Sequence, residues 1–148
     1  MSLQERVSQE IKAAMLAKAA DRLSALRMLK SALGYAQIER KTENLPDAEV
    51  VAIVQKEVKK RRDSVEQFEK GGRAELAAKE KEEIAVLEMF LPKALSAEEL
   101  EKLVRAAIQE LGATSKKDMG PVIKAVQAKA AGSADGKSIS ALVGKLLP

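Results

Sequence analysis

The chain has 148 residues, of which 46% are hydrophobic and only 2% aromatic, and it carries a net charge of +4. It contains no cysteine and no histidine, which excludes disulfides, thiolate catalysis and zinc–cysteine sites and removes the commonest general base. Charges interrupt every apolar run and the opening MSLQERVSQEIK lacks a signal-peptide core, so a cytoplasmic protein with no membrane-spanning segment is expected.

Two helices are predicted at the start of the chain. Apolar spacing predicts the first over about 2–19 and the second up to about Lys41, after a break at Ala20–Asp21 where Asp21 can act as the N-cap. The predicted buried positions of the first are Leu3, Val7, Ile11, Ala14 and Met15. The second has two apolar rows, which favours packing against more than one neighbour. These rows are Leu26, Leu29 and Leu33, and Ala25, Met28, Ala32 and Tyr35.

A basic strip lies on the remaining side of the second predicted helix. At about 100° per residue, Arg27, Lys30, Gly34 and Lys41 fall together on that side. The strip is either an ordinary solvated face or a patch for an anionic partner.

Two longer helices are predicted next. Pro46 suits the first turn of a third helix that runs to about Lys70 and ends at Gly71–Gly72. A fourth runs from about Arg73 to Phe90 before Pro92. Their apolar positions are Val50, Val54, Val58, Val65 and Phe68, and Leu76, Ile84, Leu87 and Leu91. Four amphipathic helices with short connections predict an all-α, bundle-like N-terminal domain over residues 1–92.

A charged residue interrupts the apolar face of each of these longer helices. Arg61 lies ten residues before Gly71 and Glu80 nine after it, so an antiparallel hairpin brings the two level. We expect a structural ion pair, because a charge on a buried face is costly unless it is paired. The alternative is that both side chains extend to water along the helix edges.

The rest of the chain predicts a small three-helix tail domain over residues 93–148, beyond a boundary at Leu91–Leu95. Ser96 and Glu99 form a capping box, and Gly112 ends the helix that follows. A second helix is expected to start near Asp118, so that Pro121 falls within its first turn. Asp135 can cap the last one. The predicted buried positions are Leu100, Leu103, Val104, Ala107, Ile108 and Leu111, then Met119, Val122, Ile123, Val126 and Ala130, then Ile139, Leu142, Val143 and Leu146.

Several stretches of the chain resemble a known family. GATSKKDMG, KAAGSADGK and the short amphipathic end are similar to the tail domain shared by the YqeY family and the B subunit of the glutamyl/aspartyl-tRNA amidotransferase. Three earlier stretches are similar to the YqeY family in the same order: ADRLSALRMLKSAL, KEVKKRRDSVEQFEKGGRAEL and KEKEEIAVLEMFLP. Because these stretches cover nearly the whole chain, the resemblance implies a free-standing YqeY-like protein. Pro121, which follows DMG, departs from the pattern of the family.

The resemblance implies a partner, either tRNA or a tRNA-handling enzyme. The related tail contacts the tRNA body, and the module also occurs joined to tRNA-charging enzymes. Lysines near helix starts suit phosphate contacts. The expected RNA-binding residues are Lys116, Lys117, Lys124 and Lys137, with Arg27, Lys30 and Lys41 as a weaker second patch. The few aromatic residues fall mostly on apolar faces, which disfavours stacking of unpaired bases.

No catalytic motif is found. Thr114-Ser115-Lys116 lies in a helix-start context where hydroxyls cap N–H groups, and the pairs Glu82–Glu83 and Glu98–Glu99 are typical of exposed helices. The expected function is a non-catalytic, tRNA-associated accessory protein with no cofactor and no metal. One alternative is a carbon–nitrogen ligase with glutamine as amido-N-donor, the label that family membership would transfer. The other is an adaptor that docks on a translation enzyme without RNA contact. No oligomeric state is predicted.

Overall fold

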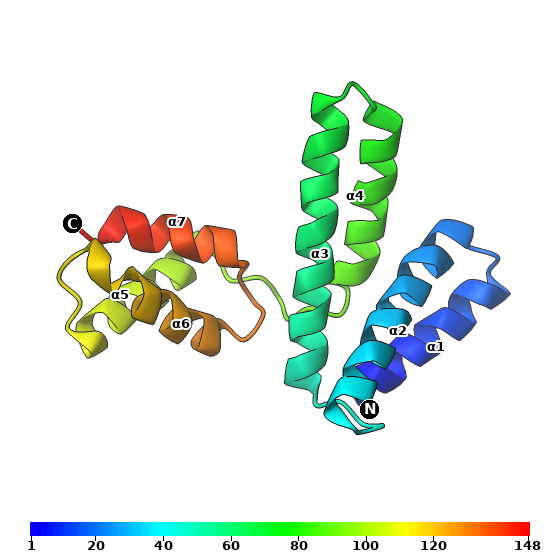
Figure 1. Cartoon of the computed structure of the whole chain (residues 1–148), viewed down its shortest axis with the longest axis horizontal. Helices are drawn as coiled ribbons and strands as arrows, with labels where there is room; N and C mark the ends of the chain where they lie inside the picture. The colour runs from blue at the N-terminus through cyan, green and yellow to red at the C-terminus, as the bar shows by residue number, and fades with distance from the viewer. The chain divides into compact units, whose positions relative to one another are not determined.

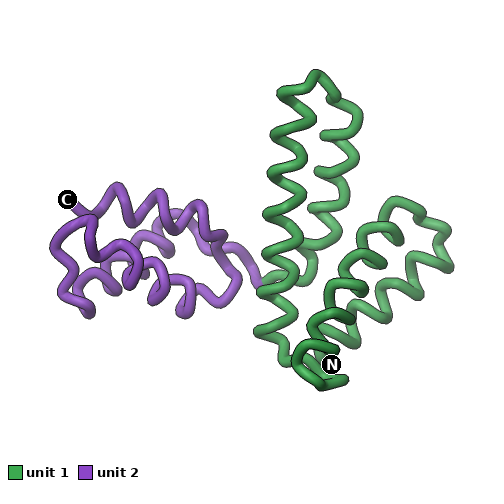
Figure 2. Tube along the Cα trace, in the orientation of Figure 1, with its two compact units in different colours: residues 1–91 green, residues 92–148 purple.

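The computed structural model describes residues 1–148 and contains seven α-helices and no strand, which confirms the all-α prediction. In chain order the helices are α1 (Leu3–Leu16), α2 (Ala20–Arg40), α3 (Asp47–Lys70), α4 (Ala74–Glu88), α5 (Ala97–Leu111), α6 (Met119–Ala130) and α7 (Gly136–Leu146) (Figure 1). The chain divides into two compact units, Met1–Leu91 and Pro92–Pro148 (Figure 2). The division of the chain into two domains over residues 1–92 and 93–148 stays a prediction. No helix has both the length and the apolar character needed to cross a membrane.

Helices α1 and α2 form the first hairpin. Ser2 caps α1 through reciprocal hydrogen bonds with Glu5, but α1 ends at Leu16 because Lys18 takes a left-handed conformation with φ of 55°. The Ala19 N–H donates to the Ala14 carbonyl, which makes the connection tight. Helix α2 therefore begins at Ala20, and the predicted N-cap role of Asp21 is wrong. Asp21 instead lies in the first turn, where its charge still favours the helix dipole.

Helices α3 and α4 form the second hairpin (Figure 1). Pro46 takes the N-cap position of α3, and its carbonyl accepts from the Val50 N–H. The hairpin turns at Gly71–Gly72, and Gly72 has φ of 70°, which an L side chain rarely adopts. The Asp47 carboxylate accepts from the Leu3 N–H at 3.0 Å, which ties the start of α3 to the start of α1.

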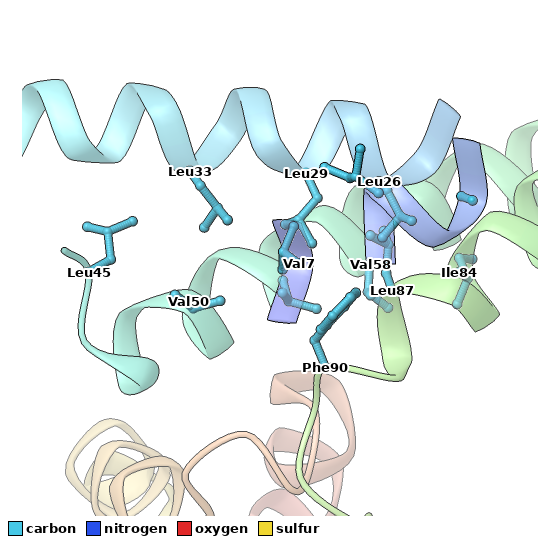
Figure 3. Packing of buried hydrophobic residues seen from close by; sticks show 13 residues of the cluster. Val7, Leu26, Leu29, Leu33, Leu45, Val50, Val58, Ile84, Leu87 and Phe90 are labelled. Atoms are coloured by element: carbon cyan, nitrogen blue, oxygen red, sulfur yellow. The ribbon is translucent and has the colours of Figure 1, made fainter. Parts of the chain in front are cut away.

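The core of the first unit is aliphatic apart from Phe90. Its buried members come from all four helices and two connections: Val7, Ile11, Ala14, Leu26, Leu29, Leu33, Leu45, Val50, Val54, Val58, Ile84, Leu87 and Phe90. Figure 3 shows Phe90, just beyond the end of α4, pointing among Val7, Leu87 and the side chains of α3. The segment after α4 is thus held to the unit by one large side chain.

Four predicted core positions of this unit are exposed: Met15, Met28, Tyr35 and Leu76. Helix α4 buries Ala77 with Ile84 and Leu87, so Leu76 points outward. The turn end of the α3–α4 hairpin lies away from α1 and α2 (Figure 1), which leaves Val65 and Phe68 only partly buried. The periodicity of the sequence identifies which residues share the apolar side of a helix. Whether each of them is buried depends on which neighbouring helix packs against that turn.

Arg61 lies buried where α2 meets the α3–α4 hairpin. Its Nη1 lies 3.2 Å from Glu80 Oε2 and also donates to Glu83 Oε2, and its Nη2 lies 3.3 Å from Met28 Sδ. The side chains of Arg61 and Glu83 are 8% and 6% exposed, against 22% for Glu80. The expectation of an exposed Glu83 is therefore wrong, because Arg61 binds it as the more deeply buried of the two carboxylates.

The second unit is built from α5, α6 and α7. Ser96 and Glu99 form the predicted capping box of α5, and Gly112 ends the helix with φ of 63°. The Leu95 N–H donates to the Ser133 carbonyl at 2.8 Å and joins the segment before α5 to the corner between α6 and α7. The buried core is Leu100, Val104, Ala107, Val122, Val126, Ala130, Ile139, Val143 and Leu147. Leu111, predicted to be buried, is 51% exposed because it lies in the last turn of α5.

Candidate nucleic-acid interface

The start of α6 carries two neighbouring lysines in a capped turn. Ser115 caps a 3-10 turn over Lys116–Asp118, and α6 begins directly after Asp118, as predicted. Pro121 lies in the first turn of α6, where its missing N–H removes no helical hydrogen bond. Lys116 and Lys117 are exposed and form no ion pair within the chain.

The backbone N–H groups at this helix start are largely engaged. The Asp118 carboxylate accepts from the N–H groups of Thr114 and Ser115 at 3.0 and 3.4 Å, and the Ser115 hydroxyl accepts from the Lys117 N–H at 3.4 Å. An incoming phosphate would therefore meet the lysine ammonium groups and not free backbone donors. At α7 the Asp135 carboxylate likewise accepts from the Ser138 N–H, which confirms the predicted cap.

Helix α7 packs antiparallel to α6. A Cβ on Gly136 would lie 3.4 Å from Gln127 Nε2, and a Cβ on Gly144 would lie 3.5 Å from Met119 Cε. The start of α7 is therefore beside the C-terminal half of α6, and its end is beside the start of α6.

This packing separates one of the four predicted tail lysines from the others. Lys137, in the first turn of α7, lies at the opposite end of α6 from Lys116 and Lys117, about 18 Å along a helix of this length. Lys145, exposed in the last turn of α7, lies at the same end as Lys116 and Lys117. Lys145 was not among the predicted residues, and the signal that could have found it is the antiparallel register of α6 and α7, which follows from their short connection.

Lys124 lies about two helical turns along α6 from Lys117, and it is exposed and forms no ion pair within the chain. By contrast, Lys129 pairs with Glu110 at 3.0 Å. We use the name "tail lysine cluster" for Lys116, Lys117, Lys124 and Lys145. From Gly112 to Pro148 the sequence has six lysines and two aspartates, so the potential of this part of the second unit is positive.

The weaker predicted patch lies on the first unit. Arg27, Lys30 and Lys41 are all exposed along α2, and none forms an ion pair within the chain. Their surroundings differ from the prediction, because Tyr35 and Ile38 are also exposed on this helix. The sequence analysis placed Tyr35 in a buried row. The α2 strip is therefore a mixed basic and apolar surface.

Three of the groups considered for catalysis have structural partners. The Ser115 hydroxyl caps the 3-10 turn, Glu83 binds Arg61, and Glu99 belongs to the capping box of α5. No group of three or more His, Cys, Asp or Glu side chains is arranged to hold a metal ion. Ser115, Glu83 and Glu99 therefore serve the local structure.

Known proteins are similar to this chain along most of its length. The family described as Yqey-like protein matches residues 4–147. An uncharacterized protein of Schizosaccharomyces pombe is 33% identical over 91 residues, which is 62% of this chain and 73% of that protein. Altered inheritance of mitochondria protein 41, mitochondrial, of Eremothecium gossypii is 33% identical over 111 residues, which is 73% of this chain and 60% of that protein. The chain thus spans less than two thirds of this second relative.

Proposed function

Since the chain belongs to the YqeY family, we propose that it is a non-catalytic accessory protein that binds tRNA through its second unit. The observation that carries the proposal is the tail lysine cluster. Its members are exposed and unpaired within the chain: Lys116 and Lys117 lie in the 3-10 turn before α6, Lys124 lies on α6, and Lys145 lies in the last turn of α7. Such lysines neutralise phosphates and release the counterions that surround RNA.

The second unit is suited to the RNA backbone and not to single bases. It contains no aromatic residue, so it cannot stack unpaired bases. Lysine is a point charge on a flexible stem, which binds phosphate without reading sequence. The expected ligand is therefore the folded body of tRNA, recognised through its backbone and shape. A cytoplasmic location is part of the same proposal.

The first test reverses two charges of the cluster. Lys117→Glu combined with Lys124→Glu should weaken tRNA binding about tenfold at low salt, because two phosphate contacts are replaced by repulsion. The slope of log affinity against log salt should fall by about two. Fluorescence anisotropy with labelled tRNA measures both, and circular dichroism should show unchanged helicity.

The matched control is Lys93→Glu combined with Lys102→Glu. These lysines are exposed in the same unit, lie outside the cluster and undergo the same change in charge. The control variant should lose clearly less affinity than the test variant. Equal losses would mean that net charge alone governs binding, and an unchanged affinity of the test variant would remove the tail lysine cluster from the site.

We also propose that residues 1–92 and 93–148 are separate domains. Limited proteolysis of the whole protein should then cut first within Leu91–Leu95, since a linker opens more readily than a packed helix. Mass spectrometry of the first fragments identifies the cut. First cuts inside α4 or α5 would contradict the division.

A second role, as an adaptor for another protein, is favoured by one observation. Tyr35 and Ile38 are exposed together on α2, far along the chain from the tail lysine cluster. No such observation favours the glutamine-using ligase, since Ser115, Glu83 and Glu99 have structural partners.

A further inference from the structure

Helix α2 carries apolar side chains on two sides. Its inner side supplies Leu26, Leu29 and Leu33 to the core. On its outer side Tyr35 is 76% exposed and Ile38 is 77% exposed, about one turn apart. Large apolar side chains that cluster on one exposed helix face mark an interaction surface more often than isolated ones do.

Gly34 lies next to this outer face, between the side of Tyr35 and Ile38 and the side that carries Arg27 and Lys30. A Cβ there would meet nothing within 4 Å, so no packing inside the chain requires glycine. Glycine nevertheless weakens a helix interior relative to alanine. Beside it lies a shallow hollow of about 430 Å³, lined by Gly34, Gln37, Ile38, Lys41, Thr42 and Glu43. A missing side chain next to exposed apolar groups suits the close approach of another backbone.

One edge of the outer face is basic. At about 100° per residue, Arg27, Lys30 and Lys41 lie on the same side as Gly34. No aspartate or glutamate occurs between Arg22 and Glu39, and the nearest acidic residue of the hollow is Glu43 at its rim. Arg40, by contrast, is already paired with Glu49 at 2.7 Å. The three cations of the edge therefore have no acidic partner within the chain.

We propose that the outer face of α2 docks an amphipathic helix of another protein, one with an apolar face and a glutamate- or aspartate-rich edge. The apolar side of that helix packs on Tyr35 and Ile38, and its backbone approaches at Gly34. Its acidic edge lies along Arg27 and Lys30, which sets the direction and register of docking. Tyrosine and arginine, the residue types of Tyr35 and Arg27, are enriched at such interfaces.

Charge argues against the two other occupants. In an antiparallel pair of two α2 helices that cross at Gly34, the two basic edges meet, which would bring Arg27 of each copy close to Lys41 of the other. Ribose-phosphate backbone would satisfy the basic edge but would leave Ile38 without an apolar partner. A foreign acidic helix satisfies both parts of the face. This proposal does not depend on tRNA binding by the second unit.

The test uses the full-length, isotope-labelled protein and two synthetic helical peptides. Each has roughly 18 residues, enough to follow the face from Ser24 to Lys41. Both present leucine and isoleucine on one face, and they differ only in an edge of glutamates or of lysines. The glutamate peptide should shift the amide signals of Gly34, Tyr35 and Ile38 and bind about tenfold tighter than the lysine peptide. Equal binding by the two peptides, or none, would overturn the proposal.

Two variants sharpen this test. Arg27→Glu combined with Lys30→Glu should invert the preference, so that the lysine peptide binds tighter. Gly34→Leu should keep or raise the denaturation midpoint, because the new side chain meets open space, yet lower the affinity for the glutamate peptide about tenfold. The matched control, Ala52→Leu on the exposed side of α3, should leave the affinity unchanged.

The other occupants give distinct results in the same samples. If tRNA, and not the glutamate peptide, shifts the signals of Gly34 and Ile38, the face binds nucleic acid and the proposal is wrong. If sedimentation shows a dimer that Gly34→Leu abolishes, the face belongs to a second copy, and the proposal is equally wrong.

Discussion

Arg61→Met should destabilise the first unit by roughly 3–5 kcal/mol, because it leaves the buried Glu83 carboxylate without its partner. Arg61 holds Glu80 and Glu83 on α4 and contacts Met28 on α2, so one side chain links three helices. Urea unfolding followed by circular dichroism measures the loss. An Arg61→Met variant as stable as the parent would show that the cluster does not hold these helices together.

The two carboxylates should respond unequally. Glu80→Leu should lower the free energy of unfolding clearly less than Glu83→Leu does. Glu80 is more exposed, and its removal leaves the pair of Arg61 with Glu83 intact. Combining Arg61→Met with Glu83→Leu should recover most of the stability lost by Arg61→Met alone. A double variant as unstable as Arg61→Met would mean that packing, and not the unpaired carboxylate, causes the loss.

Phe90→Ala should lower the free energy of unfolding by a similar amount, about 3–5 kcal/mol, because Phe90 is only 2% exposed in the core of the first unit. The side chain also lies under Arg6, whose guanidinium carbon is 5.4 Å from the ring centroid. Removing the ring leaves a cavity among Val7, Leu87 and their neighbours (Figure 3). The measurement is again urea unfolding.

The chain supplies its own control for this substitution. Phe68, the other of its two phenylalanines, is only partly buried near the turn of the α3–α4 hairpin. Phe68→Ala should therefore lower the free energy of unfolding clearly less than Phe90→Ala does. The stability of Phe90→Leu should fall between those of Phe90→Ala and the parent. Similar losses for both alanine variants would contradict the central place of Phe90 in the core.

Helix boundaries were the most predictable feature, because short-range chemistry sets them. Ser96 with Glu99, Gly112 and Asp135 each act within three or four residues of the chain, and each takes its expected role. Asp21 failed as a cap because the tight link after α1, closed by Ala19, moved the start of α2. Caps are thus predictable where the preceding connection is long enough to leave them free.

Burial was less predictable, because it depends on neighbours distant in the sequence. Tyr35 and Leu76 belong to apolar rows by spacing, yet no helix of their unit covers them. Glu83 looked like one of two exposed neighbouring glutamates, yet Arg61 reaches it from α3. For the candidate interface, helical spacing places Lys117 and Lys124 opposite the apolar face of α6, and both are exposed. The separation of Lys137 and the nearness of Lys145, by contrast, depend on the packing of α7 on α6.

The most direct test of the central claim is a salt titration of the whole protein with bulk tRNA and with duplex DNA, from about 50 to about 200 mM salt. We predict tighter binding to tRNA than to DNA at every salt concentration and a steep linear fall of log affinity with log salt, since lysines read phosphates arranged by folded RNA. Equal affinity for the two nucleic acids, or tRNA affinity that does not change with salt, would contradict tRNA binding by the tail lysine cluster.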